Sequence, residues 1–429
     1  MKVLLTGAKG FVGRHLLTSL RDAGHSVTAA VRDPEAFRRQ WPAVDAIACD
    51  FMTDTGKAVW MERLTGFDAV VNCAGVLQRG PGVDPERIHH LGPAALFDAC
   101  SDLGLRKVIQ ISAISAREGV ATEYAETKCR GDAHLMALDL DWVILKPSLL
   151  IARGSYGGTS LIRALAALPG VVLLPGKGDQ TFQPLHLEDL GRALVKLVGE
   201  DGFSKIVLEP SGPVTLSLKE ILMLYRSWLG LGKAIAIEVP LPLVRLACRV
   251  GDLIGGGALR STSLDQILQG NAGDSQGFQE AVGFRPRSLG ESLQREASDV
   301  QDRWHAQLYF LAALATFALA ATWILSGLTG LLLLPEVAER VAARLGLYGG
   351  AAQVASTASC LMDIAVGLWV ASRLRPGCCA VVQVAIVAAY TLLLGIAIPE
   401  LWSDPFGPLL KNLPMLALIP VWAVLAKSK

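Results

Sequence analysis

The chain has little of what marks a metalloprotein or a nucleic-acid-binding protein. Its 40 lysines and arginines are almost balanced by 39 aspartates and glutamates, for a formal net charge of +1, whereas a nucleic-acid footprint is strongly basic. None of the eight cysteines stands in C-x-x-C spacing, and no histidine–cysteine cluster has the spacing of metal ligands. We therefore expect no nucleic acid and no bound metal, and we interpret the cysteines as reduced thiols packed in a core.

Charge is also missing from long stretches near the C-terminus. Residues 306–334 contain no charged side chain, and about 20 apolar residues are enough for a helix to cross a bilayer. The four apolar segments are 306–334, 349–372, 376–399 and 412–426, of which the last is the shortest. We predict an all-α membrane domain over residues 301–429 with four transmembrane helices.

The charges between these segments predict their orientation. One end of the segments carries a positive excess, formed by Arg303, Arg373, Arg375, Lys427 and Lys429. The positive-inside rule then places both termini in the cytoplasm. The N-terminus lacks the pattern of a signal peptide. We therefore expect a multi-pass protein of the inner, cytoplasmic membrane whose N-terminal domain lies in the cytoplasm.

The first 300 residues have the pattern of an α/β domain. Up to about residue 150, short Val-, Ile- and Ala-rich runs alternate with helical stretches, and the runs are apolar on both faces, as in a parallel sheet covered by helices. The expected strands are residues 2–6, 26–32, 46–49, 69–72, 107–112 and 142–146. We predict a Rossmann-type doubly wound parallel sheet forming a cofactor half at 1–150, and a substrate half with a small lobe at 151–300.

A glycine-rich sequence, TGAKGFVG at residues 6–13, joins the first expected strand to the first expected helix. Gly7 permits a tight turn, Gly10 lets the backbone approach a pyrophosphate, and Gly13 lets helix and strand pack closely. The helix N-terminus supplies N–H donors to the phosphates. We predict a dinucleotide site here, the alternative being an ordinary glycine-rich turn. Its predicted contacts are Gly7, Lys9, Gly10, Phe11, Val12 and Gly13.

The end of the second expected strand bears on the choice of dinucleotide. An NAD-specific site needs a carboxylate there for the ribose 2′-hydroxyl, but Val31 stands at this position and Arg32 follows it. A guanidinium suits a 2′-phosphate, and Lys9 and Arg14 add positive charge nearby. We predict NADP(H), with NAD(H) as the alternative if Asp33 turns towards the ribose. A solvated surface residue is the other interpretation of Arg32.

Two further strand ends are expected to border the cofactor. Asp50 follows the third strand, where an acid can meet the adenine amine or cap the next helix. Asn72, Ala74 and Gly75 follow the fourth strand and are expected to run along the cofactor.

Together these marks resemble the short-chain dehydrogenase/reductase superfamily in its extended and atypical branches, which are NAD-dependent epimerase/dehydratase-like. The matching motifs are TGAKGFVG (6–13), NCAG (72–75), YAETK (124–128), KPS (146–148) and PLHLEDL (184–190). The run ISAISA (111–116), the tyrosine–lysine pair and KPS are most similar to the Rossmann-fold accessory subunit of respiratory complex I and its bacterial relatives. The resemblance covers roughly residues 1–300, and the membrane block resembles the DoxX-like four-helix family.

The resemblance implies a catalytic tyrosine and lysine, Tyr124 and Lys128. They are four residues apart and so share one face of a helix. In the family the tyrosine exchanges a proton with a substrate oxygen while hydride moves to or from the nicotinamide. An unperturbed tyrosine has a pKa of about 10, and a neighbouring ammonium group is expected to lower it. Lys128 is also expected to hold the nicotinamide ribose. The alternative is a partly exposed tyrosine and a surface lysine.

The family's third catalytic residue is a serine or threonine, and the aligned position here does not hold either one. Its usual position after the fifth strand falls on Ile114, between two serines. We predict Ser112 in this role, with Ser115 as the second choice. This departure from the family pattern weakens the prediction of a complete active site.

Two further motifs take their roles from the resemblance. Pro147 stands in the bend after the sixth strand, which in relatives brings backbone close to the nicotinamide amide. His186 and Asp189 match a structural motif before a helix, and we expect Asp189 to cap a helix or lock the fold rather than to catalyse.

Asp363 is the one acid inside an expected span. A charge there costs several kcal/mol unless it is paired or faces water. It is a candidate functional group, with Ser356, Thr357 or Gln383 expected near it, or else a hydrogen-bonded residue of helix packing.

These observations predict a membrane-anchored NAD(P)H-dependent oxidoreductase that acts on a lipophilic or membrane-associated carbonyl or hydroxyl substrate. One alternative is a non-catalytic NADPH-binding protein with a structural or regulatory role, which the departure at Ile114 favours. The other is a membrane domain that is itself the active part, with the Rossmann domain as its sensor.

Overall fold

The computed structural model describes residues 1–117, 119–254, 258–333 and 335–427. The chain forms two compact units, an N-terminal unit over Met1–Ala306 and a C-terminal unit over Gln307–Lys429. Leu334, the end of the first expected span, and Lys429 lie outside the described residues.

The N-terminal unit is built on a seven-stranded sheet in the order β11-β6-β5-β4-β1-β2-β3, in which every neighbouring pair is parallel. The strands are β1 (Lys2–Thr6), β2 (Ser26–Val31), β3 (Asp45–Ala48), β4 (Ala69–Asn72), β5 (Lys107–Ile111), β6 (Asp141–Leu145) and β11 (Ile206–Leu208). The strand order reverses between β1 and β4, and doubly wound sheets bind ligands beyond the carboxyl ends of the strands at such a point. The predicted Rossmann-type sheet is confirmed.

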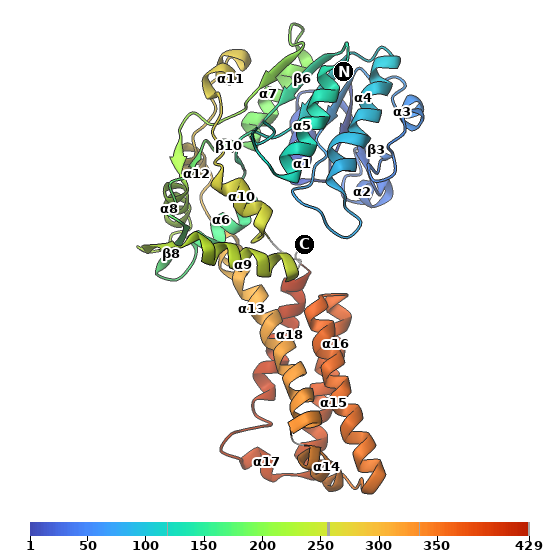
Figure 1. The fold of residues 1–429 in the computed structure, drawn as a ribbon, viewed down its shortest axis with the longest axis vertical. Helices are drawn as coiled ribbons and strands as arrows, with labels where there is room; N and C mark the ends of the chain where they lie inside the picture. Colours follow the sequence, from blue (N-terminus) through green and yellow to red (C-terminus); the bar gives the residue numbers. More distant parts are fainter. Residues whose placement is uncertain (118, 255–257, 334, 428–429) are drawn as a thin grey trace. The chain divides into compact units, whose positions relative to one another are not determined.

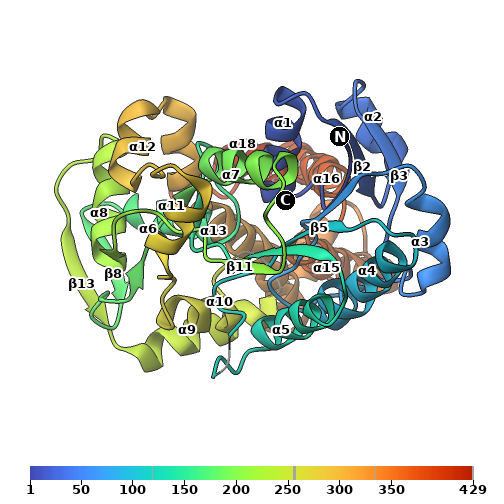
Figure 2. The same cartoon turned by 90° about the horizontal axis from the view of Figure 1, so that it is seen from above.

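Helices cover both faces of this sheet (Figures 1 and 2). The helices are α1 (Phe11–Asp22), α2 (Pro34–Gln40), α3 (Lys57–Arg63), α4 (Gly92–Asp102), α5 (Glu123–Met136) and α7 (Leu187–Gly199). Successive residues of a strand point to opposite faces, so Leu5 packs with the leucines of α1 and α7, whereas Leu4 packs with Trp60 of α3 and Phe97 of α4. The sheet is therefore buried on both sides, as its continuous apolar strands predict.

The helical segment between β4 and β5 is not a regular α-helix throughout. It begins as a π-helical turn, η1 (Arg87–Leu91), and continues as α4. Pro93 has no N–H to offer the carbonyl of His89 four residues earlier, so the regular α-helical hydrogen bond cannot form and the turn widens.

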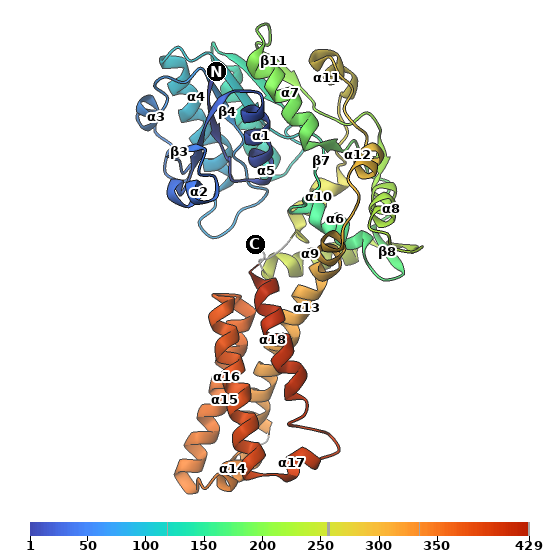
Figure 3. The same ribbon diagram turned by 180° about the vertical axis from the view of Figure 1, so that it is seen from behind.

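Apart from α7 and β11, most of the second half of the N-terminal unit forms a smaller lobe beside the sheet (Figure 3). Its paired strands are β7 (Leu150–Ile151) with β10 (Leu185–His186), β8 (Val171–Pro175) with β13 (Ile235–Val239), and β9 (Thr181–Phe182) with β12 (Leu216–Ser217). Its helices are α6 (Gly158–Ala166), α8 (Leu218–Trp228), α9 (Leu241–Ile254), α10 (Ser261–Leu268), α11 (Ser275–Val282) and α12 (Leu289–Arg295). Phe182, Ile221 and Tyr225 are buried in its core. That this lobe binds substrate stays a prediction.

The C-terminal unit is helical. Its elements are α13 (Val300–Leu328), which starts in the N-terminal unit, η2 (Thr329–Leu333), α14 (Pro335–Arg344), α15 (Gly349–Ser372), α16 (Pro376–Ala397), α17 (Glu400–Ser403) and α18 (Asn412–Ala426). Among the described residues, three stretches are long and apolar enough to cross a membrane: Val300–Leu332, Gly349–Ser372 and Pro376–Ala397. The expected fourth span is the 15-residue helix α18. At about 1.5 Å per residue it is shorter than the roughly 30 Å hydrocarbon core of a bilayer.

Small residues bring the helices of this unit together. A Cβ atom added to Gly367 of α15 would lie 2.5 Å from the side chain of Ile324 and 3.0 Å from the carbonyl oxygen of Ala320 on α13. Trp323 and Trp422 fill the core that these contacts enclose. This close approach of backbones is the usual way in which helices associate in a membrane.

Candidate functional site

The glycine-rich loop is shaped by contacts that leave no room for side chains. Gly7 has a φ of +66°, and a Cβ there would lie 2.6 Å from the carbonyl oxygen of Cys73 in the loop after β4. A Cβ on Gly13 would overlap the carbonyl oxygen of Gly7. Gly10 is the N-cap of α1 and has no side chain with which to satisfy the amides of the first turn. The loop thus forms a cradle free of side chains at the N-terminus of α1, which is the geometry expected of a pyrophosphate site.

The cationic residues expected around this cradle are exposed. Lys9, Arg14 and Arg32 are all exposed, and the Arg14 guanidinium lies 5.4 Å from the centre of the Phe11 ring. Asp33 accepts a hydrogen bond of 2.9 Å from the backbone N–H of Ala36 and so caps α2. Because this cap occupies the carboxylate, the alternative in which Asp33 turns to a ribose would cost the helix its cap.

Asp50 serves the turn that follows β3. Its Oδ1 accepts a hydrogen bond of 3.0 Å from the N–H of Met52. The structure therefore shows Asp50 in a local hydrogen bond. Contact between this carboxylate and an adenine stays a prediction.

A buried chain of side chains crosses the carboxyl edge of the sheet. The Thr6 hydroxyl of β1 donates to Asn72 Oδ1 on β4, and Asn72 Nδ2 donates to Gln110 Oε1 on β5 over 2.7 Å. All three are at most 1% exposed. The side chain of Asn72 thus stabilises the sheet edge, and Ala74 and Gly75 carry the loop onward from it.

Tyr124 and Lys128 lie together on α5. The Thr122 side chain caps this helix by accepting from the N–H of Ala125 over 3.2 Å. Lys128 Nζ lies 5.8 Å from the centre of the Tyr124 ring and donates to the carbonyl of Ile111 over 3.1 Å. It is also 3.5 Å from the position that a Cβ of Gly75 would take. The structure therefore brings the predicted pair to the loop after β4.

The expected effect of Lys128 on the tyrosine is wrong for this structure. Burial raises the pKa of Tyr124, and the nearby carboxylate of Asp132 raises it further. Burial lowers the pKa of Lys128 itself. The physical reason is that burial disfavours the charged phenolate, and the carboxylate of Asp132 acts in the same direction.

Ser112 belongs to a buried network around Asp132. Its hydroxyl donates to Asp132 Oδ2 over 2.6 Å, and Lys146 Nζ lies 3.6 Å from the same oxygen. Asp132 is 1% exposed, and burial raises its pKa although Ser112, Lys128 and Lys146 act in the opposite direction. The hydroxyl of Ser112 is thus already engaged, and its assignment as the catalytic serine stays a prediction.

The neighbouring positions close the edge of the sheet. Ser115 and Ile114 are buried. The N–H of Ile114 donates to the carbonyl of Pro147 over 3.2 Å, which joins the ends of β5 and β6. Pro147 therefore lies at the same carboxyl edge as Ser112.

His89 is a residue of this site that the sequence analysis missed. Its Nε2 accepts a hydrogen bond of 3.0 Å from the N–H of Val76, so its proton is on Nδ1, which lies 2.8 Å from Thr127 Oγ1 on α5. Its ring meets that of Tyr124 edge-on, with the ring centres 5.5 Å apart. Burial and the charge of Lys128 lower the pKa of His89 to about 2. The only sequence signal was a histidine on the buried side of the helix after β4.

His89 consequently ties the loop that lines the cofactor site to the helix that carries Tyr124 and Lys128. The Thr127 hydroxyl oxygen accepts the hydrogen bond from Nδ1–H, and the hydroxyl itself donates to the carbonyl of Glu123 over 2.7 Å. The buried, neutral imidazole thus links the N–H of Val76 to the hydroxyl of Thr127, and each hydrogen bond in this chain has a defined donor and acceptor.

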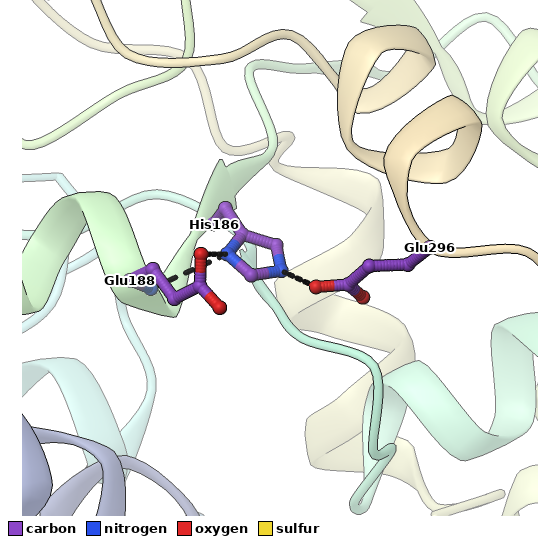
Figure 4. Close-up of side chains that lie close together, drawn as sticks. All are labelled: His186, Glu188 and Glu296. Carbon is purple, nitrogen blue, oxygen red and sulfur yellow. Dashed lines mark hydrogen bonds and ion pairs between the residues drawn. The ribbon is translucent and has the colours of Figure 1, made fainter.

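A second cluster gathers three potential metal ligands, His186, Glu188 and Glu296 (Figure 4). His186 Nε2 lies 3.3 Å from Glu296 Oε1. A cation is already present, because Arg287 Nη2 lies 2.7 Å from Glu188 Oε2 and 3.0 Å from His186 Nδ1. Asp189 accepts from the backbone N–H of Arg287 over 3.0 Å and pairs with its guanidinium. This arrangement agrees with the expectation that Asp189 locks the fold.

The acid of the membrane helices has other partners than those expected. Asp363 is 7% exposed and accepts hydrogen bonds from Ser326 on α13 over 3.3 Å and from Tyr390 on α16 over 3.2 Å. The expected neighbour Gln383 instead accepts from Trp323 Nε1 over 3.0 Å, and Ser356 donates to the carbonyl of Gln353 within α15. These partners lie on neighbouring helices, and the sequence alone does not show which residues of two helices face each other.

The fold and the glycine cradle define a class of protein, the NAD(P)-binding Rossmann proteins. Comparison with known families agrees: the family described as NAD(P)H-binding matches residues 7–167, and the DoxX-like family matches residues 320–420. The chain therefore joins an NAD(P)-binding Rossmann domain, similar to short-chain dehydrogenases and epimerases, to a DoxX-like domain. The predicted fusion is confirmed.

Individual relatives support the same assignment. The chain is 28% identical over 196 residues to the ceramide reductase of Caulobacter vibrioides, covering 45% of this chain and 59% of the relative. It is 22% identical over 218 residues to the mitochondrial 40 kDa subunit of NADH-ubiquinone oxidoreductase of Neurospora crassa, covering 50% and 56%. The chain spans well under two thirds of the length of these curated relatives. Their names agree with the prediction of an oxidoreductase.

Solved structures show the same fold. The UDP-glucuronic acid 4-epimerase of Bacillus cereus, in complex with UDP-glucuronic acid and NAD, superposes with a TM-score of 0.52 at 20% identity. The match covers 72% of this chain and 100% of that chain. This likeness shows that the N-terminal unit and the epimerase share a fold.

Proposed function

We propose that this protein is a membrane-anchored, NADPH-dependent oxidoreductase that converts a carbonyl group of a lipophilic substrate to a hydroxyl group, or the reverse. The observation that carries the proposal is the place of Lys128, whose Nζ lies beside both the Tyr124 ring and the backbone of Gly75. The pair thus adjoins the loop that leaves the β1–β4 switch point, where this fold binds a dinucleotide.

The proposed cofactor contacts follow the carboxyl edge of the sheet. The backbone of the loop from Gly7 to Gly13 would hold the pyrophosphate, and Arg32 would hold a 2′-phosphate. The engagement of Asp33 as a helix cap supports NADP(H) over NAD(H). When bound, the nicotinamide supplies hydride exchange with the reacting carbon.

The residues of the chain handle the proton and the positioning. The Tyr124 hydroxyl would give its proton to the substrate oxygen in reduction and take it back in oxidation. Burial favours the protonated phenol, which suits the donor role and therefore the direction of reduction. Lys128 would hold the ribose, and its charge would assist the phenolate as the proton leaves. Asp132 and His89 would keep Lys128 and Tyr124 in place.

Membrane anchoring supports a lipophilic substrate. In the part of the chain that the structure describes, three stretches are long and apolar enough to span a bilayer, and the site is joined to them covalently. We propose that the protein is an inner-membrane protein with both termini in the cytoplasm, because the positive excess lies at that end of the spans. The similarity to a ceramide reductase supports a long-chain lipid ketone as the substrate class.

A second candidate is a non-catalytic NADPH-binding protein. Two observations favour it: the Ser112 hydroxyl is engaged by Asp132, and the position between the two serines is the buried Ile114. In this case the nucleotide would stabilise the fold without turnover.

Replacing the tyrosine hydroxyl tests the first candidate against the second. The full chain in lipid nanodiscs would be assayed for NADPH oxidation with a keto form of ceramide. Tyr124→Phe should reduce kcat by about 10²–10⁴-fold, since it removes the proton donor, and leave NADPH affinity unchanged. Tyr348→Phe is the control, because Tyr348 is 71% exposed in the C-terminal unit. NADPH binding without turnover in the wild type would favour the non-catalytic role, and full activity of Tyr124→Phe would exclude the mechanism.

The cofactor preference has its own test. Calorimetry with NADPH and NADH should show that Arg32→Ala weakens NADPH binding by about 10- to 150-fold, because a charge-assisted hydrogen bond to a phosphate is worth about 1.5–3 kcal/mol. NADH binding should not change. Arg21→Ala, at the far end of α1, is the matched control. Equal losses for both nucleotides would exclude a 2′-phosphate contact.

A further inference from the structure

Helix α9 of the N-terminal unit presents an apolar strip to solvent. Leu243 is 58% exposed, Leu246 58% and Val250 47%. These residues are three and four positions apart, so they lie along one face of the helix. Single exposed leucines are ordinary on a protein surface, but an aligned strip on one helix marks an interaction site.

The opposite face of α9 is already packed. Cys248 is 2% exposed, and a Cβ on Gly251 would overlap the carbonyl oxygen of Leu259. The helix is therefore held against the segment that leads into α10 by one face, and the apolar strip is a second, separate face.

Cationic side chains border the strip. Arg245 and Arg249 are exposed and lie four positions apart, between the strip and the packed face. The acid on this part of the helix, Asp252, pairs with Arg260 over 3.6 Å. An apolar strip with arginines along its flank is the pattern of a helix that lies in a membrane interface.

The strand before α9 extends the apolar surface along the chain. On β13, Ile235 is 72% exposed and Ile237 is 43% exposed. They are two residues apart and so point to the same side of the strand. Lys233, just before them, is exposed as well.

The same unit is covalently tied to the membrane helices. Helix α13 begins at Val300, inside the N-terminal unit, and the charge-free run starts at residue 306. Arg303 and Trp304, which is 61% exposed, stand just before that run, where such residues mark the membrane–water interface. The tether keeps every exposed helix of this unit at a high effective concentration near lipid headgroups.

We propose that α9 binds the surface of the bilayer as an interfacial helix. Leu243, Leu246 and Val250 insert between the acyl chains, and Arg245 and Arg249 bind the phosphates of anionic phospholipids. This surface does not depend on the proposed enzymatic activity, since it would place the small lobe against the membrane whether or not the site turns over a substrate.

Photo-crosslinking of the full chain in nanodiscs that hold one copy each tests the proposal. The reactive residue would be introduced as Leu246→p-benzoylphenylalanine in discs that contain phosphatidylglycerol, and intact phospholipid adducts would be measured by mass spectrometry. The control is Val207→p-benzoylphenylalanine, because Val207 is equally apolar and 42% exposed on β11. Unchanged NADPH binding shows that both variants are folded.

We expect a phospholipid adduct at position 246 and background yield at 207. Either Arg245→Gln or Arg249→Gln, combined with the reactive residue at 246, should lower the binding constant of α9 for the bilayer surface about fivefold. Each cation near an anionic surface contributes about 1 kcal/mol. Equal yields at 246 and 207 would overturn the proposal. So would crosslinking to a second copy in discs that hold two copies, with no lipid adduct. The adduct yield should also fall in discs of neutral phosphatidylcholine. A yield that is unchanged in those discs and in both arginine variants would overturn the role of the anionic lipid.

Discussion

Asp132 in the N-terminal unit and Asp363 in the C-terminal unit are both buried carboxylates, but their partners differ. Asp132 accepts a hydrogen bond from Ser112 and has Lys146 Nζ at 3.6 Å, with Lys128 close enough to affect its titration. Asp363 accepts hydrogen bonds from the hydroxyl groups of Ser326 and Tyr390. The charge of Asp132 is balanced by lysines. Asp363 accepts its hydrogen bonds from neutral hydroxyl groups.

The difference shows how each unit satisfies the same side chain. In the N-terminal unit, removing the acid leaves two lysines without their counter-charge, and an uncompensated buried charge is costly. In the C-terminal unit, removing the charge leaves hydroxyl groups that can serve any other acceptor of similar shape. The same isosteric change should therefore have unequal effects at the two positions.

The largest effect is expected for Asp132→Asn. Breaking a buried ion pair by removing one partner costs about 3–5 kcal/mol, and here it also lowers the pKa of Lys128 further, because the carboxylate opposes the effect of burial on that pKa. Hydrogen exchange of the α5 amides in the full chain should show this loss as a lower free energy of opening. Loss of less than about 1 kcal/mol, the range of a surface pair, would mean that Asp132 is not charged in the native state.

A smaller and pH-dependent effect is expected for His89→Asn. The pKa of His89 is lowered to about 2, so below its unfolded value only the unfolded state takes up the proton. Its stabilisation is complete above about pH 6.5 and is lost as the pH falls, by about 1.4 kcal/mol per pH unit. Between pH 6.5 and pH 5, the wild type should therefore lose about 2 kcal/mol more than the variant.

The asparagine at position 89 keeps one acceptor and one donor for Val76 and Thr127, which makes it a conservative replacement. The free energy of opening would be measured by hydrogen exchange of α5 at both pH values. Other histidines with lowered pKa values titrate in both proteins, so only the difference is assigned to His89. Identical slopes for wild type and variant would show that this histidine is already protonated or exposed in the native protein.

The elements that the sequence predicts well are those with a local or periodic signal. The apolar runs predict six of the seven strands of the parallel sheet to within one or two residues, and the spacing of Gly7, Gly10 and Gly13 predicts the loop before α1. Both rest on backbone requirements that act within one segment of the chain. The charge-free run after residue 306 predicts a membrane helix for the same reason.

The parts that the sequence did not predict depend on contacts between distant segments. Asp132 was not singled out, because its role arises from Ser112 twenty residues earlier and Lys146 fourteen residues later. The partners of Asp363 lie on α13 and α16, whereas two of the three expected ones were on its own helix. The expected lowering of the Tyr124 pKa was wrong for the same reason, because the shift depends on how deeply the tyrosine is buried by other segments.

The smallest effect is expected for Asp363→Asn, and this prediction sharpens the comparison with Asp132→Asn. The amide oxygen of asparagine can accept a hydrogen bond from Ser326 or Tyr390 as the carboxylate does. A hydrogen bond between side chains inside a membrane protein is worth about 0.6 kcal/mol on average, so the unfolding free energy should change by less than about 1 kcal/mol. Denaturation of the full chain in bicelles, followed through the C-terminal unit, would measure it. A loss of 3 kcal/mol or more, in the range of a broken buried ion pair, would show that Asp363 is charged and has a cationic partner, and the contrast between the two acids would disappear.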